Sequence, residues 1–290
     1  MSFLENVDRK KLQQILLIAL ASLVVIALAL ILVIIIASVD KDISDGFSSA
    51  ELVEYTVTDK DYKTGSLVLA DSDHPYSVEA TMLNLVNCKE FRNSQSDATG
   101  VDTQDYHDKN YIPWQAMSFS KDAMVAAHKM LTAARDNVNP NEPVTIDAAY
   151  DTVKHGEVSP EYATAQLMLL SDMTSSASTR VPLSEEYRAW FDKNAAKYGF
   201  IESFEDAYRF VDVPHAKYMT DEDLSLAEYI EYLKENTSAD QVLTVKASGE
   251  EYAIYYVDCN VGDKIEVPED ADFTVSGTNE GGVVVTVILE

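Results

Sequence analysis

Residues 208–219, YRFVDVPHAKYM, bring together an arginine, an aspartate and a histidine: Arg209, Asp212 and His215. These residue types bind anions, carry protons and ligate metals. The apolar run that stops at a proline predicts a β-strand followed by a turn. The residues just before it, SFEDA, contain no histidine or cysteine. The segment therefore has the composition of an active-site edge, but no soft metal ligand precedes it.

The other residues of catalytic type form no familiar motif. The five histidines are scattered along the chain: His74, His107, His128, His155 and His215. Neither HExxH nor a Cys/His cluster occurs, and there is no GxSxG. Whether Cys88 and Cys259 pair stays open, because sequence does not show whether they lie close. Local motifs alone identify no hydrolase of the zinc, serine or cysteine type.

The charge of the chain excludes two classes of partner. It carries 49 acidic and 22 basic residues, a formal net charge of -27. Such a surface repels nucleic acid and anionic lipid. We therefore expect neither as a partner.

One long apolar run predicts a membrane anchor. Residues 15–37 read ILLIALASLVVIALALILVIIIA, with Ser22 the single polar side chain. As a helix rising ~1.5 Å per residue, this run covers a hydrocarbon core of ~30 Å. Basic residues 9–11 precede it and an acidic stretch follows, so the positive-inside rule puts the N-terminus in the cytoplasm and the remainder outside. A cleaved signal peptide is the alternative, but its apolar region is usually ~7–15 residues long.

Caps and apolar spacing predict four helices. The first covers residues 121–136, capped by Ser118 or Ser120. The second begins at Ser159 and runs through residues 161–170. The other two run from Ser184 to Gly199, and from Thr220 onward with Leu226, Ile230 and Leu233 on one face.

Strands are predicted at three places before the last quarter of the chain: residues 67–69, 144–148 and 208–213. Between them, residues 89–110 are polar and read as irregular. After Asn236 the runs QVLTVKA, YAIYYV, KIEVP, FTVSG and GVVVTVIL predict a small all-β module. The predicted fold class is α+β with a β tail.

Three of these segments together resemble the VanY-type D-alanyl-D-alanine carboxypeptidases, exported zinc peptidases that trim peptidoglycan stems. Residues 65–76, GSLVLADSDHPY, are close to the family strand G-x-L-x-L-V-N-x-x-H-P. Residues 190–201, WFDKNAAKYGFI, resemble W-L-x-x-N-A-x-K-Y-G-F-I, and residues 208–219 resemble F-R-Y-V-G-x-x-H-A-x-x-M. The resemblance covers roughly residues 64–290 and implies a small antiparallel sheet with helices.

Members of this family bind zinc through the histidine and aspartate of S-x-H-x-x-x-x-x-x-D and the histidine of E-x-W-H, whose glutamate is the base. A catalytic zinc needs about three protein ligands and an open position for water. The resemblance places Tyr162 and Leu169 at the first two ligand positions. It places Ala207 at the second histidine, Asp206 at the tryptophan and Phe204 at the base. Alanine and leucine cannot bind zinc, and phenylalanine cannot accept a proton.

The arginine that takes the substrate carboxylate in the family also lacks a counterpart. Its motif S-G-Y-R-S corresponds to AAYDT, which keeps Tyr150 but has Asp151, and an aspartate repels a carboxylate. Shifting the second zinc motif by one would bring Glu205 nearer the base position, but it would break the match downstream. The resemblance therefore implies no catalytic residue and no bound metal. Four candidate groove residues remain: Tyr150, Asp151, Arg209 and His215.

The expected organisation has five parts: a cytoplasmic tail over 1–14, a transmembrane helix over 15–37, an extracellular stalk over 38–63, a carboxypeptidase-like domain over 64–237 and the β module over 238–290. The leading hypothesis is a membrane-anchored, extracellular carboxypeptidase-like protein without zinc or peptidase activity. Its partner would be peptidoglycan or a cell-envelope protein.

Two alternatives stay open. In one, the chain is an active zinc carboxypeptidase with relocated ligands, using His107, His155 or His215 with nearby acids. In the other, it is a structural interaction module whose old groove is filled.

Overall fold

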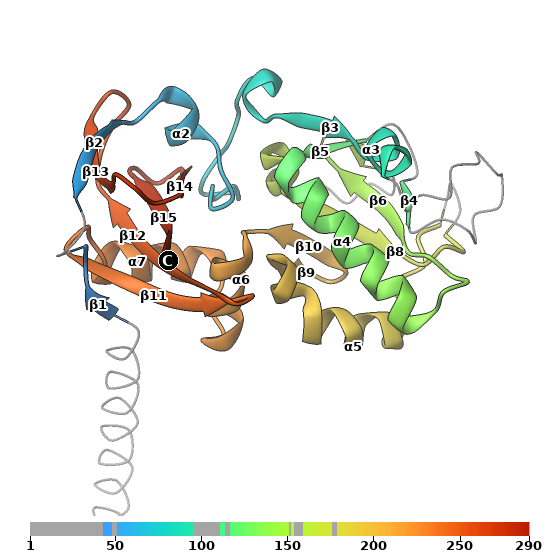
Figure 1. Ribbon diagram of the computed structural model, residues 1–290. Coiled ribbons are helices and arrows are strands. Elements are labelled where there is room, and N and C mark those ends of the chain that lie inside the picture. The colour runs from blue at the N-terminus through green and yellow to red at the C-terminus, as the bar shows by residue number, and fades with distance from the viewer. Residues whose placement is uncertain are drawn as a thin grey trace, which may run out of the picture. The chain divides into compact units, whose positions relative to one another are not determined.

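The fold is described from a computed structural model (Figure 1). It describes residues 43–47, 51–95, 111–113, 117–150, 152–153, 159–175 and 179–289. The chain divides into two units, Met1–Ser44 and Asp45–Glu290. Strand β1 covers Ile43–Asp45, and everything that follows concerns the second unit. The predicted anchor over residues 15–37 lies outside the described residues, and within them no helix has the length and apolarity to cross a bilayer.

A mixed six-stranded sheet forms the centre of the unit. Its main path runs β4-β6-β8-β10-β9, with β7 paired to β6. All pairs are antiparallel except β4 with β6. The strands are β4 (Ile112–Pro113), β6 (Thr145–Ala149), β7 (Thr152–Val153), β8 (Leu167–Ser171), β9 (Phe200–Phe204) and β10 (Ala207–Phe210). The predicted strands over 144–148 and 208–213 correspond to β6 and β10.

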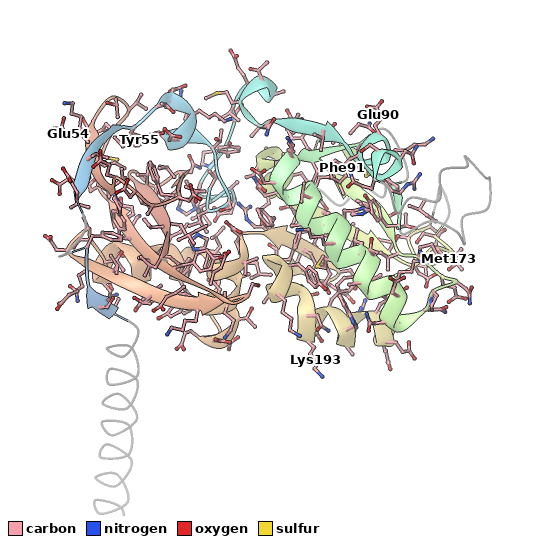
Figure 2. All side chains as sticks on the ribbon, in the orientation of Figure 1. Glu54, Tyr55, Glu90, Phe91, Met173 and Lys193 are labelled. Carbon is pink, nitrogen blue, oxygen red and sulfur yellow. The ribbon has the colours of Figure 1, made fainter. Side chains whose placement is uncertain are left out.

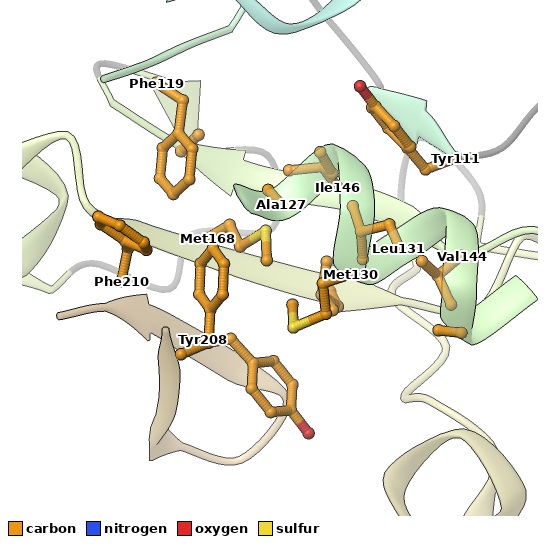
Figure 3. Packing of buried hydrophobic residues seen from close by; sticks show 14 of the residues in the cluster. Tyr111, Phe119, Ala127, Met130, Leu131, Val144, Ile146, Met168, Tyr208 and Phe210 are labelled. Carbon is orange, nitrogen blue, oxygen red and sulfur yellow. The ribbon is translucent and has the colours of Figure 1, made fainter. Parts of the chain in front are cut away.

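Two helices cover one face of this sheet. Helix α4 (Lys121–Val138) begins at Ser120, whose hydroxyl accepts from the Ala123 N–H. Helix α5 (Glu185–Asn194) begins at Ser184 and continues as the short helix η4 (Ala195–Tyr198). Their apolar faces meet the sheet in one buried core (Figure 3). Both helices were predicted from their caps and apolar spacing.

Gly199 ends this helical stretch for a steric reason. Its φ is +83°, a left-handed conformation that is unfavourable for residues with a side chain but not for glycine. A Cβ at this position would lie 2.9 Å from the Asp212 backbone carbonyl carbon. The close approach lets η4 turn directly into β9.

The C-terminal residues form a second sheet, as predicted. Strands β11, β12, β15 and β14 follow one another in that order, all antiparallel, around their own apolar core. These strands are β11 (Gln241–Ala247), β12 (Glu250–Val257), β14 (Phe273–Gly277) and β15 (Val283–Leu289), whereas β13 (Lys264–Pro268) lies outside this sheet. Helices α6 (Val213–Asp221) and α7 (Leu226–Asn236) connect the two sheets, and both contact the second.

Part of the segment predicted as a stalk is folded. Strand β2 (Leu52–Thr56) pairs with β13, and helix α2 (Asp59–Lys63) begins with a capping box at Thr58. Tyr55, labelled in Figure 2, packs edge-on against Phe273 of β14 at 5.3 Å. Residues 52–63 therefore belong to the folded unit and cannot serve as a free spacer.

Three further local predictions were wrong. The predicted helix from Ser159 stops at once: η3 (Pro160–Thr164) ends at Ala165, whose φ is +57°, and the LMLL run enters the sheet as β8. Residues 67–69 are buried but form no strand, although Asp71 and His74 make the predicted turn. The last helix opens at Ser225, because residues 220–221 still belong to α6.

The region predicted as irregular begins with a helix. The remaining elements are η1 (Ala80–Met82), β3 (Leu85–Asn87), α3 (Cys88–Ser94) and β5 (Ser118–Ser120). Strands β3 and β5 form an antiparallel pair, and Phe91 of α3 (Figure 2) lies edge-on to His128 of α4 at 6.0 Å. The side chain of Asn87 caps α3 by accepting two backbone N–H groups. Residues 96–110 lie outside the described part.

Candidate functional site

The four positions at which the resemblance places zinc chemistry come together. Leu169 of β8 is the register partner of Ala207 in β10, and Ala207 is also paired with Phe204 at the end of β9. Tyr162 of η3 packs on the same group. With Ala148 and one further leucine, they form a single apolar cluster. This apolar cluster lies on β6, β8 and β10, apart from the core that contains α4 and α5.

The side chains of the apolar cluster do not fit a zinc ion. Zinc in proteins is held by about three nitrogen, oxygen or sulfur atoms. Among Leu169, Phe204 and Ala207 there is no side-chain donor of any kind, and Tyr162 contributes one phenol. Leu169 and Ala207 are 1% and 0% exposed, so carbon atoms fill the space around them. In the part of the chain that the structure describes, no other group of three His, Cys, Asp or Glu residues could hold a metal.

Arg209 lies two residues beyond Ala207, and its guanidinium is bound by other groups of the protein. It is 1% exposed, and Nη1 lies 3.3 Å from Glu161 Oε2. Nη2 donates to the carbonyl oxygen of Val68 at 2.6 Å. Burial lowers the pKa of Arg209, and the Glu161 carboxylate opposes that shift. Arg209 was predicted as a groove residue, and here it ties η3 and residues 66–68 to β10.

His215 was also predicted as a groove residue, and the structure corrects this. It is 2% exposed in the interior of α6, between α7 and β15. Nδ1 is bonded to the Tyr229 hydroxyl at 2.8 Å and Nε2 to the Thr286 hydroxyl at 3.0 Å. Burial lowers the pKa of His215 to about 3, so the ring is neutral at physiological pH. With both nitrogens bonded, His215 is not available as a relocated metal ligand.

The other predicted groove residues are only partly placed. Tyr150 is half-buried, and its N–H donates to the Ser118 carbonyl at 3.1 Å. Its phenol and the Arg209 guanidinium both act electrostatically on Tyr76, whose pKa burial raises to about 12. Asp151 lies outside the described residues, as do His107 and His155. Tyr150 and Arg209 are therefore near neighbours of one phenol, and the role of Asp151 stays a prediction.

Asp206, one residue before Ala207, forms a charged network that the sequence did not reveal. It is fully buried and has a φ of +61° at the β9–β10 turn. Arg180 Nη2 donates to its carboxylate at 2.6 Å and Arg188 Nε at 2.7 Å. The Leu183 N–H adds a third donor at 3.2 Å. No sequence motif predicts this network, because Arg180 lies in a loop and Arg188 in α5, both well before Asp206 in the sequence.

A cavity of about 470 Å³ lies beside the apolar cluster. It runs along β9 and is lined by Glu161, Glu202, Tyr208 and Arg209, among others. Leu169, Phe204 and Ala207 are not among its lining residues. Sequence analysis missed this cavity, because its lining comes from segments that are far apart along the chain.

Comparison with known proteins identifies relatives. No family model matches the chain. The chain is 27% identical over 263 residues to a D-alanyl-D-alanine carboxypeptidase of Enterococcus faecium, covering 83% of this chain and 80% of that protein. The structure of the vancomycin-resistance D,D-dipeptidase VanXYg superposes with a TM-score of 0.61 at 17% identity, over 83% of this chain and 100% of that one. A VanY D,D-pentapeptidase superposes with a TM-score of 0.38 at 14% identity, over 57% and 98%.

Proposed function

Since the chain belongs to the VanY-type D-alanyl-D-alanine carboxypeptidase family, we propose that it is a non-hydrolytic member. In this proposal it binds no zinc, releases no D-alanine, and instead binds a cell-wall component or a protein of the cell envelope. Residues 15–37 would anchor it in the membrane, with the folded unit on the outer side.

The observation that carries the proposal is the apolar cluster. The residues to which the resemblance assigns three zinc-ligand positions and the base position pack together there: Tyr162, Leu169, Ala207 and Phe204. A water-activating zinc requires ligands and a proton acceptor at these places. The side chains present supply one phenol oxygen, and they pack as a small core. Retention of the fold without the reactive groups supports a binding role.

The filling of the apolar cluster also favours a second candidate, a structural interaction module without a ligand groove. Tyr162 is 4% exposed and Phe204 is partly buried against the same residues. In that case the protein would meet its partner through another surface. Binding of soluble muropeptides distinguishes the two, because only a ligand-binding member should retain them.

The test of the proposed function uses the full chain purified in detergent. We expect no stoichiometric zinc, no D-alanine released from a stem pentapeptide, and sedimentation with purified peptidoglycan. Stoichiometric zinc together with D-alanine release would overturn the proposal and favour an active enzyme with relocated ligands.

A matched variant tests whether the four positions are correctly assigned. It restores the family residues as Tyr162→His, Leu169→Asp, Phe204→Glu and Ala207→His. We expect this variant to retain zinc after dialysis while the parent does not, with circular dichroism as the check on folding. A folded variant that holds no more zinc than the parent would show that the positions are wrong.

A further inference from the structure

The cavity of about 470 Å³ follows the open edge of a β-sheet. Strand β9 is the last strand on the path of the six-stranded sheet. Residues 200–203 of this strand line the cavity, with α5 contributing Asp192 and the α6–α7 connection contributing Asp223. An edge strand beside a cavity presents backbone groups to whatever enters it.

The pairing of β9 shows which backbone groups face outward. The Val211 N–H donates to the Gly199 carbonyl at 2.8 Å, which makes these two a hydrogen-bonded pair. In an antiparallel ladder, hydrogen-bonded and non-bonded pairs alternate. The pair Arg209–Ile201 is therefore bonded, whereas Phe200 and Glu202 turn their peptide groups away from β10. Phe200 is 0% exposed, so of these two residues only the exposed Glu202 presents its peptide groups to the cavity. Across the described part of the chain, no hydrogen bond reaches these outward groups.

The charge of the lining is strongly one-sided. Its carboxylates are Asp71, Glu161, Asp192, Glu202 and Asp223. Arg209 is the single cation of the lining, and Glu161 and the Val68 carbonyl already hold it. Burial raises the pKa of Glu202, and the Asp192 carboxylate adds to that shift, whereas the Asp206 N–H and Arg188 oppose it. A positively charged ligand would complement this lining.

A buried hydroxyl at the cavity supports the presence of a ligand independently of charge. Tyr208 lines the cavity and is 1% exposed, and its hydroxyl has no hydrogen-bond partner. Figure 3 shows this hydroxyl turned away from Ile146 and Ala127 in the core. A buried hydroxyl without a partner destabilises the fold, and a peptide carbonyl entering the cavity could accept a hydrogen bond from it.

We propose that this cavity docks an extended polypeptide segment bearing lysine or arginine side chains, which lies along β9. Its backbone would bond to Glu202, and its cations would meet the carboxylates of Asp192 and Glu202. The inference goes beyond the proposed function and does not depend on it, because none of Leu169, Phe204 and Ala207 lines the cavity.

The test measures binding of a short synthetic peptide in which lysine alternates with threonine and valine. The partner is the full chain in detergent at physiological salt. We expect the peptide to bind, the same peptide with glutamate in place of lysine not to bind, and the double variant Asp192→Asn/Glu202→Gln to bind roughly tenfold more weakly. On binding, the amide of Glu202 should exchange hydrogen more slowly, whereas burial already protects that of Phe200 and pairing with β10 that of Ile201.

A charge-matched control separates docking from general attraction to an acidic protein. Glu269→Gln/Asp270→Asn removes the same charge from an exposed loop that does not line the cavity. This control should bind the lysine peptide within about twofold of the parent. Equal weakening in both double variants, or unchanged exchange at Glu202, would overturn the proposal. Neither result bears on zinc content or D-alanine release.

Discussion

Ala207 and Asp206 are neighbours in the chain, yet they belong to clusters of opposite chemistry. Ala207 lies with Leu169 and Tyr162 in the apolar cluster. Asp206 accepts hydrogen bonds from Arg180 and Arg188. Both side chains are fully buried. One turn thus joins an apolar cluster to a network of paired charges. The first stabilises the fold by apolar burial and the second by charged hydrogen bonds.

The difference shows where this fold retains buried charge. A buried carboxylate is tolerated when several donors surround it, as they surround Asp206. A cluster of histidine and carboxylate ligands would need a metal to balance it. In the apolar cluster no such balance is required. The contrast predicts that the two clusters respond differently to substitution.

The largest effect is expected at Asp206. Asp206→Ala leaves two arginines without their shared carboxylate, and we expect a loss of about 3–5 kcal/mol in the free energy of unfolding. Asp206→Asn should lose less, because asparagine tolerates positive φ and still accepts a hydrogen bond. Urea denaturation measures both. A loss below about 1 kcal/mol for Asp206→Ala would mean that the network contributes little.

A smaller loss is expected in the apolar cluster. Leu169→Ala removes buried carbon and should lower the free energy of unfolding by about 2–4 kcal/mol. Leu169→Met conserves volume and should cost less than about 1.5 kcal/mol. If alanine and methionine proved equally mild, the position would not be packed as a core, and the comparison with Asp206 would fail.

His215 extends the contrast to a group that is buried neutral. Its folded pKa of about 3 lies below the unfolded value of 6.5, so the unfolded chain gains a proton first as the pH falls. This contribution to stability is complete above pH ~6.5 and is lost on acidification, by on the order of 1 kcal/mol per pH unit. His215→Gln should have a flatter dependence between pH 7 and pH 5. Equal slopes would contradict the burial of a neutral ring.

His74 provides a control of opposite sign. Its ring lies 2.7 Å from Asp71 and 2.9 Å from Glu280, and the hydrogen bond to Asp71 raises its pKa above 6.5. The stabilisation is complete below pH ~6.5 and is lost as the pH rises through the folded value. His74→Gln should therefore be more destabilising at pH 6 than at pH 9. Thermal denaturation at the two pH values measures the difference.

The smallest effect is expected at the exposed end of the charged network. Glu205 Oε1 lies 2.8 Å from Arg188 Nη2, but its side chain is 70% exposed. Glu205→Gln should change the free energy of unfolding by less than about 0.5 kcal/mol, and added salt should remove even that. A large effect would mean that the network extends to the surface.

The sequence predicted elements whose signals were local. Ser120 and Ser184 cap α4 and α5, and Gly199 ends the second helical stretch. The helix predicted after Ser159 was wrong although Ser159 does cap a short helix, because the sequence does not show which strands the following residues pair with. The run LMLL fits a helix or a buried strand equally well, and only pairing with β6 and β10 selects the strand.

The site was predictable to the extent that it lay in short motifs. The family resemblance assigned Tyr162, Leu169 and Ala207 to the three zinc-ligand positions, and in the structure these three residues pack in one cluster. His215 was misplaced because sequence does not show that a histidine on a helix faces Tyr229 and Thr286. The β9 cavity was missed because its lining comes from segments that are far apart along the chain.

The pairing of β2 with β13 has a consequence for biosynthesis. Val53 of β2 is paired with Val267 of β13. Strand β2 is therefore synthesised more than 200 residues before its partner strand. At a synthesis rate of ~5–20 residues per second, that delay is on the order of 10–40 s. During this time the backbone N–H and C=O groups of β2 lack the partners that β13 supplies, and they can pair with another extended segment.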